Sequence, residues 1–433
     1  MQAILKRRFK FLTVLRNRDY RTYYLGMVAS VTSVLAMTTA QGWLIFDMTG
    51  SPAALGVIAG LQALPGLVFN LVAGALADRI DPRRIIIYGE GTASLTMIAL
   101  GVVVVTGTVE VWHVAAAAFI TGVATSFDQP ARRAVWPLLI PREQMIFGSS
   151  MNASVWNGTQ IIAPSVAGTT IAVVGGLSGD YRLGAGVVYF MLATGFASMA
   201  VAMVVINLPE VQRSRGATVF HDIVEGLKFT IENRIFLVLL SLSLVFGYFG
   251  LSYQWLMPVF AEEVFGIGPE GLGMLLSANG IGGFVGIMFI ASFGQYQSRS
   301  WVIGIAGISF GASLLMFALT SSLGWLPLSM LFVAITGAIF SIFQIATASM
   351  LNLLVPHELR GRVMGLRGIT WSLAPLGALQ AGILADLVSV QFSVATGAVV
   401  IVLFTGLMLI LSKDLRHVRR LVEEVDQAPA HRS

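Results

Sequence analysis

The 433-residue chain contains no cysteine and only 5 His. The absence of cysteine excludes disulfides, thiolate zinc sites, iron–sulfur clusters and a cysteine nucleophile. The histidines lack the H-E-x-x-H spacing of a zinc protease, and no G-x-x-x-x-G-K-[ST] phosphate-binding loop occurs. An intramembrane catalytic site would need His, Asp and Glu clustered at helical spacing, and the sequence contains no such cluster. The sequence therefore predicts neither a cofactor nor an enzymatic activity.

Charged residues are also scarce. They make up 11% of the chain, against roughly 25% in a soluble domain, while apolar residues make up 56%. So few charges cannot cover a water-facing surface, but they suffice if much of the surface faces lipid. The net charge of +5 does not indicate a nucleic-acid partner, because the basic residues lie in short segments between apolar runs. The composition predicts an all-α membrane protein.

Twelve apolar runs are long enough for membrane-spanning helices, which need about 20 residues each. The first run is too long for the apolar region of a signal peptide, so we interpret it as a span. The expected spans lie roughly at 20–47, 53–77, 84–107, 111–131, 144–175 and 184–207 in the first half, and at 235–261, 270–293, 301–321, 325–350, 361–385 and 391–412 in the second.

The distribution of basic residues predicts the topology. If the N-terminus is cytoplasmic, all of the 27 Lys and Arg residues except Arg182 fall on the inner side of the membrane. A wrong number of spans would scramble this alternation. The pattern therefore predicts cytoplasmic N- and C-termini.

Two sequence matches indicate an internal duplication. Pro52-x-x-Leu55-Gly56 recurs 217 positions later at Pro269, and the segment starting at Leu138 recurs 215 positions later at Leu353. Six spans per copy would make a parallel repeat. We therefore expect two six-helix bundles at 1–207 and 234–412, a cytoplasmic linker with an amphipathic helix at 208–233, and a cytoplasmic tail at 413–433.

The loop after the second run carries the sharpest motif. It resembles the G-x-L-a-D-r-x-g-r-[RK] signature of the major facilitator superfamily, through Gly74-Ala-Leu-Ala-Asp78-Arg79-Ile-Asp81-Pro82-Arg83-Arg84. Gly74 would allow close helix approach. Arg84 is expected to reach Asp128 near the inner end of the fourth run, and such a charge cluster can bias a two-state transporter.

Further segments resemble one branch of that superfamily, the enterobactin-exporter-like transmembrane secretion effectors, which include macrolide-efflux types. The segments that match this branch are Leu15-Arg-Asn-Arg-Asp-Tyr-Arg21, Gly42-Trp-Leu44, Met48-Thr-Gly-Ser-Pro52, Glu225-Gly-Leu-Lys-Phe229 and Pro356-His-Glu-Leu-Arg-Gly-Arg-Val363. The resemblance implies a bacterial inner-membrane exporter that works by alternating access and uses the proton gradient. Gly158, Pro164 and Gly168 partly resemble the kinked G-P-x-x-G-G signature of exporters, although Ala163 and Ala167 replace glycines. A simple proline kink with small packing residues is the alternative.

Few carboxylates lie inside the expected spans, and Glu90 is the best placed. It lies seven residues past Arg83, about 10 Å along a helix, and intramembrane ionisable residues usually serve a function. We expect Glu90 to couple transport to protons; the alternative is a structural Glu neutralised by the inner Arg cluster. Asp128 is expected to be structural. Candidate cavity-lining residues, for which interhelical hydrogen bonds are the alternative, are Gln41, Gln160, Gln254 and Gln344.

The leading hypothesis is a proton-coupled exporter of amphiphilic small molecules, such as drugs or siderophore-like metabolites. The expected partners are this substrate, the lipid bilayer and protons, and the chain is expected to act as a monomer in the bacterial inner membrane. An importer or facilitator on the same fold is the first alternative, because fold does not set substrate or direction. A non-transporting membrane scaffold is the second. The sequence does not identify the substrate.

Overall fold

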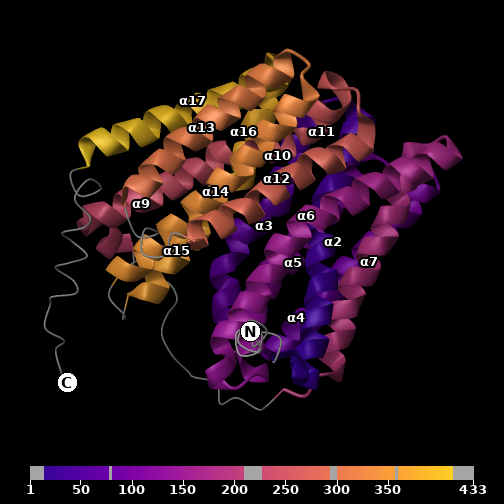
Figure 1. Ribbon diagram of the computed structural model, residues 1–433. Coiled ribbons are helices and arrows are strands. Elements are labelled where there is room, and N and C mark those ends of the chain that lie inside the picture. Colours follow the sequence, from indigo (N-terminus) through magenta and orange to yellow (C-terminus); the bar gives the residue numbers. More distant parts are fainter. Residues whose placement is uncertain (1–13, 78–79, 209–226, 293–299, 356–358, 413–433) are drawn as a thin grey trace, which may run out of the picture. The chain divides into compact units, whose positions relative to one another are not determined.

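The computed structural model describes residues 14–77, 80–208, 227–292, 300–355 and 359–412, and nearly all of them are helical (Figure 1). The predictions for residues 209–226 and 413–433, which include most of the expected linker helix and the tail, lie outside this part of the chain. Of that linker helix, residues 227–232 are described and are helical, with Lys228 and Glu232 3.9 Å apart.

Helices lie over all twelve expected ranges. In the first half they are α2 (Arg18–Thr49), α3 (Pro52–Ala77), α4 (Pro82–Val105), α5 (Val111–Val135), α6 (Met145–Ser178) and α7 (Tyr181–Val205). In the second half they are α9 (Arg234–Val245), α10 (Ser252–Trp255), α11 (Met257–Val259), α12 (Gly268–Ser292), α13 (Ser300–Ser322), α14 (Leu326–Leu354), α15 (Arg360–Ser372), α16 (Ala374–Leu387) and α17 (Val390–Leu411).

Ten helical segments of the described chain are long and apolar enough to cross a membrane. The two remaining expected spans are α5, which carries charged residues towards its end, and the pair α15 and α16, which is broken at Leu373. The span that begins with α9 is also irregular. It contains two π-helical turns, η4 (Phe246–Gly250) and η5 (Phe260–Val264). A crossing by all twelve segments, with both termini in the cytoplasm, stays a prediction.

The helix positions follow the duplication that the sequence suggested. α2 and α9 begin at Arg18 and Arg234, 216 positions apart, and α3 and α12 begin at Pro52 and Gly268, also 216 positions apart. The chain divides into two compact units. Unit 1 comprises Met1–Gly216 and Gly266–Ser277, and unit 2 comprises Ala217–Phe265 and Ala278–Ser433. The first turns of α12 thus belong with unit 1.

A glycine contact explains why this short piece of α12 packs in unit 1. A Cβ on Gly168 of α6 would overlap the Pro269 carbonyl oxygen, and a Cβ on Gly273 of α12 would lie 2.8 Å from the Pro164 carbonyl oxygen. Only glycine permits backbones to approach so closely. The Oγ atoms of Ser165 and Ser277 complete the contact at 2.7 Å.

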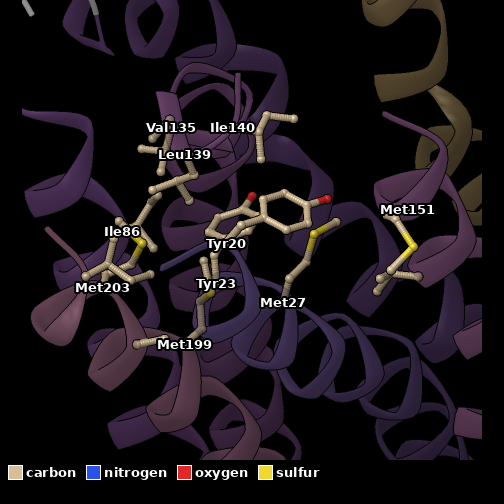
Figure 2. Packing of buried hydrophobic residues seen from close by; sticks show 14 of the residues in the cluster. Tyr20, Tyr23, Met27, Ile86, Val135, Leu139, Ile140, Met151, Met199 and Met203 are labelled. Atoms are coloured by element: carbon tan, nitrogen blue, oxygen red, sulfur yellow. The ribbon is translucent and has the colours of Figure 1, made fainter. Parts of the chain in front are cut away.

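The core of unit 1 gathers at one end of its helices, where α2, α4, α6 and α7 meet the chain that follows α5. Figure 2 shows Tyr20 and Tyr23 of α2 at its centre, and both rings are almost fully buried. The Tyr20 hydroxyl donates a hydrogen bond to the Gly148 carbonyl oxygen at 3.2 Å. Asn17 caps α2 and also donates to the Leu139 carbonyl oxygen at 2.8 Å. These contacts fix the start of α2, the helix that also contributes to the charge cluster described next.

Candidate functional site

A buried charge cluster joins α2, α4 and α5 in unit 1. Glu90 of α4, Asp128 and Arg132 of α5, and Ser30 of α2 are all nearly inaccessible, with exposed fractions of 4%, 6%, 6% and 0%. The Arg132 guanidinium bonds Glu90 Oε1 through Nη2 and Asp128 Oδ2 through Nε, the latter at 2.5 Å. Ser30 Oγ lies 2.7 Å from Arg132 Nη2 and donates to Glu90 Oε1 at 2.9 Å.

Local sequence explains why these side chains meet. Asp128 and Arg132 are four residues apart and therefore lie on the same face of α5. Gly89 lets α4 come close to α5, since a Cβ at this position would lie 3.3 Å from the Ala124 carbonyl oxygen. The neighbouring residue, Glu90, can then reach Arg132 across the helix contact.

The cluster is incompletely satisfied. Glu90 Oε2, Asp128 Oδ1 and Arg132 Nη1 are buried without a hydrogen-bond partner. With all three groups ionised, two carboxylates and one guanidinium carry a net charge of −1. A net charge away from water is costly, and one proton on either free carboxylate oxygen would remove it. The arrangement can therefore hold one exchangeable proton while Arg132 stays paired.

The cation beside Asp128 differs from the expected one. Asp128 contacts Arg132 on its own helix, and its second carboxylate oxygen has no partner, so the expected pair with Arg84 is wrong. The expected fourth span, 111–131, ends before Arg132 and so leaves this arginine outside the span. α5 continues to Val135, which keeps Arg132 inside the helix and turned inward.

The loop signature is only partly described. Asp78 and Arg79 lie outside the described residues, and Gly74 lies in the last turn of α3. Asp81 caps α4 by accepting a hydrogen bond from the Arg83 backbone N–H at 3.0 Å. The Arg83 guanidinium bonds the Val204 carbonyl oxygen in α7. Asp81 and Arg83 therefore fix the start of the helix that carries Glu90, and the switch role of this loop stays a prediction.

The four glutamines lie in different surroundings. Gln41 is fully buried and neither of its side-chain polar atoms has a partner, whereas Gln160 is exposed. Gln254 donates to Asn279 Oδ1 at 3.3 Å. Gln344 accepts a hydrogen bond from Arg367 at 2.7 Å. Two of the four thus make the interhelical bonds that the sequence offered as the alternative, and the role of all four in a cavity is untested.

The expected exporter kink falls within one continuous helix, α6. Pro164 is buried, and Gly168 makes the close contact with α12 described above. A Cβ on Gly158 would meet no atom within 4 Å, so this glycine is not needed for packing. The three positions therefore differ in what the fold requires of them.

Sequence reasoning missed Arg132 and Ser30 as members of the cluster. The four-residue spacing of Asp128 and Arg132 was the available signal, because it predicts an ion pair on a helix. The adjacent Arg133 obscured that signal, since two consecutive arginines look like a topology-setting loop. No sequence signal pointed to Ser30, whose role depends on how α2 packs against α4 and α5.

Comparison with known proteins identifies the family. The model of the transmembrane secretion effectors matches residues 10–432. The chain belongs to this family of major facilitator transporters. The match extends over both units and confirms the resemblance seen in the loop and terminal motifs.

Characterised relatives of this family member are efflux proteins. Macrolide efflux protein A of Streptococcus pyogenes is 25% identical over 374 residues, 86% of this chain and 90% of the relative. The multidrug efflux pump Tap of Mycolicibacterium fortuitum is 28% identical over 360 residues, 79% and 83% of the two chains. A bacterial homolog of the human lysosomal transporter Spinster shares the fold, with a TM-score of 0.69 at 14% identity over 96% of this chain and 99% of that one. The protein is therefore a membrane transporter and not an enzyme.

Proposed function

We propose that this transporter exports amphiphilic small molecules across the bacterial inner membrane by alternating access, as a monomer driven by the proton gradient. The efflux relatives support export, and drugs of the macrolide type are the first substrates to test. The observation that carries the coupling is the buried cluster of two carboxylates and one guanidinium, with one free oxygen on each carboxylate.

The cluster suits a proton-dependent switch. In the deprotonated state Arg132 ties α4 to α5, and through Ser30 it also reaches α2. A proton on Glu90 removes the charge that Arg132 pairs with across the α4–α5 contact. A ligand shifts a conformational equilibrium only by its differential affinity for the two states. Proton binding would meet that condition if the second conformation separates Glu90 from Arg132.

The direct test uses inside-out membrane vesicles with an imposed proton gradient and a pH-sensitive dye. A macrolide antibiotic and a set of amphiphilic drugs are added to vesicles containing wild type or Glu90→Gln. We expect drug-triggered proton release in wild type and none in the variant, because the amide cannot carry the proton. Glu143→Gln, at an exposed position of unit 1, is the matched control and should behave as wild type.

The outcomes separate the competing functions. Equal proton release from wild type and Glu90→Gln would show that Glu90 does not couple transport to protons, while the proposal of export would stand. Drug movement in the opposite direction would favour the importer. Drug uptake into the vesicles without proton movement would favour a facilitator or another driving ion. No drug movement in either variant would contradict the proposed export of this class of drug.

A further inference from the structure

Unit 2 contains an arginine inside a helix of the predicted eleventh span. Arg367 lies seven residues after the start of α15 at Arg360, about 10 Å along the helix. Its Nη2 donates to Gln344 Oε1 at 2.7 Å and lies 3.3 Å from the Gln344 carbonyl oxygen. Both partners are neutral oxygens on α14.

Arg367 has no counter-charge among its contacts. The ion pairs found in the described residues involve Arg132, Arg182 and Lys228, and none involves Arg367. Its Nε atom is buried and has no hydrogen-bond partner. Arg132 in unit 1 is paired with two carboxylates, whereas no carboxylate of the described residues pairs with Arg367. An unpaired charge in a membrane segment is expensive and usually faces a polar site that serves a function.

A group of fully buried aromatic side chains lies in the helices that pack with α15 and α14. The helix of Arg367, α15, packs against α9 and η4, and Figure 1 shows α9 and α15 close together. Phe246 of η4 stacks on Phe343, the residue before Gln344, with ring centroids 3.7 Å apart. Phe310 lies 5.1 Å from Phe246. These rings pack against one another, so among the described residues the polar contact of the Arg367 side chain in this region is the one with Gln344.

The carboxylates of unit 2 lie elsewhere in its described helices. Glu232, just before α9, lies 3.9 Å from the Lys228 amine, Glu262 and Glu263 occupy η5, and Asp386 lies next to the final residue of α16. The ion pairs found in the described residues join none of these carboxylates to Arg367. A bound carboxylate would therefore supply the missing counter-charge.

We propose that Arg367, oriented by Gln344, is the recognition point for an anionic group, a carboxylate or phosphate, on the amphiphiles that this protein transports. The inference rests on the proposed transport function and adds anionic and zwitterionic amphiphiles to the substrates expected beside macrolide-type drugs. A guanidinium binds carboxylate and phosphate through geometrically matched hydrogen bonds. Arg367 has one buried donor, Nε, still free for such a bond.

The test measures binding at equilibrium without any proton gradient, so it is independent of the coupling role of Glu90. Purified full-length protein in phosphatidylcholine nanodiscs is titrated against rhodamine 110, which has a free carboxylate, and rhodamine 123, its methyl ester. Fluorescence polarisation gives both affinities. We expect wild type to bind the acid about tenfold or more tightly than the ester, as a charge-assisted hydrogen bond implies.

Two variants of the site and one control sharpen the test. Arg367→Gln should remove the preference for the acid and leave ester binding unchanged, whereas Arg367→Lys should retain part of it. Gln344→Glu should also remove the preference, because the new carboxylate neutralises Arg367 without deleting it. Arg234→Gln, at an exposed arginine of the same unit, should match wild type. Wild type without a preference for the acid, or an unchanged preference in Arg367→Gln or Gln344→Glu, would overturn the proposal.

An anionic lipid headgroup offers the same chemistry as an anionic substrate. The titration is therefore repeated in nanodiscs that also contain phosphatidylglycerol. If the lipid leaves the acid preference intact, the site belongs to the substrate. If it abolishes the preference in wild type, the anion at Arg367 is a lipid headgroup and the substrate assignment is overturned.

Discussion

At the scale of the residue, Arg132 is the group on which the charge cluster depends. We expect Arg132→Gln to leave Glu90 and Asp128 buried without their counter-charge. Breaking a buried ion pair by removing one partner costs about 3–5 kcal/mol. The measurement is thermal unfolding of the purified protein in detergent, followed by size-exclusion chromatography, and it should show a clearly lowered midpoint.

Removing the whole cluster provides the matched comparison. The triple variant Glu90→Gln, Asp128→Asn, Arg132→Gln has no buried charge left and should recover most of the stability lost in Arg132→Gln. Its effects should be strongly non-additive, since all three side chains share contacts. If the stability losses were additive, the three residues would act independently, and the idea that the cluster acts as one unit would be wrong.

The sequence predicted some of these residues and not others, for a physical reason. Glu90 was identified because a carboxylate inside an apolar run is rare. Arg132 was missed because its burial depends on where α5 ends, and helix ends are the least certain feature of a sequence-based prediction. Ser30 and the partnerless Gln41 become visible only when helices are packed together. Residue type thus indicates that a polar group is exceptional, and tertiary packing decides its partner.

At the scale of the element, the start of α4 sets the position of Glu90. Asp81 caps this helix through the Arg83 backbone N–H. We expect Asp81→Ala to destabilise the protein by about 1 kcal/mol. Asp81→Asn keeps a capping oxygen and should stay close to wild type in the same thermal unfolding experiment. An equal loss in both variants would point to the charge of Asp81 rather than to the cap.

The contact between α6 and α12 gives a matched pair of glycine substitutions. In Gly168→Ala the new methyl group would meet the Pro269 carbonyl oxygen and the Gly273 backbone. We expect a loss typical of overpacking, about 1–3 kcal/mol. Gly158→Ala in the same helix meets no atom within 4 Å and should gain stability by up to about 1 kcal/mol, because alanine favours the helix. The measurement is thermal unfolding of the two variants. If both unfolding midpoints shifted in the same direction by the same amount, the close contact of Gly168 would not explain the difference expected here.

At the scale of the whole molecule, helix positions and the duplication were accessible from the sequence, because apolar runs and turn residues recur along the chain. The breaks inside the spans were not. The π-helical turns of the span that starts with α9 and the interruption at Leu373 leave no periodic signal, since they depend on neighbouring helices. The assignment of Gly266–Ser277 to unit 1 likewise follows from glycine packing and not from the repeat.

The predicted topology can be tested directly because the chain contains no cysteine. Asp47 and Arg182 form an ion pair at 2.7 Å, which brings the end of α2 and the start of α7 to the same side. Positive residues concentrate on the cytoplasmic side, so the side that holds Asp47 and Arg182 should be external.

In intact cells a membrane-impermeant maleimide should label Asp47→Cys and Glu110→Cys. It should label Arg133→Cys and Glu143→Cys only after the membrane is permeabilised. All four positions are exposed, so burial cannot explain a difference. The reverse pattern would invert the topology, and Glu90 would then receive its proton from the opposite side of the membrane.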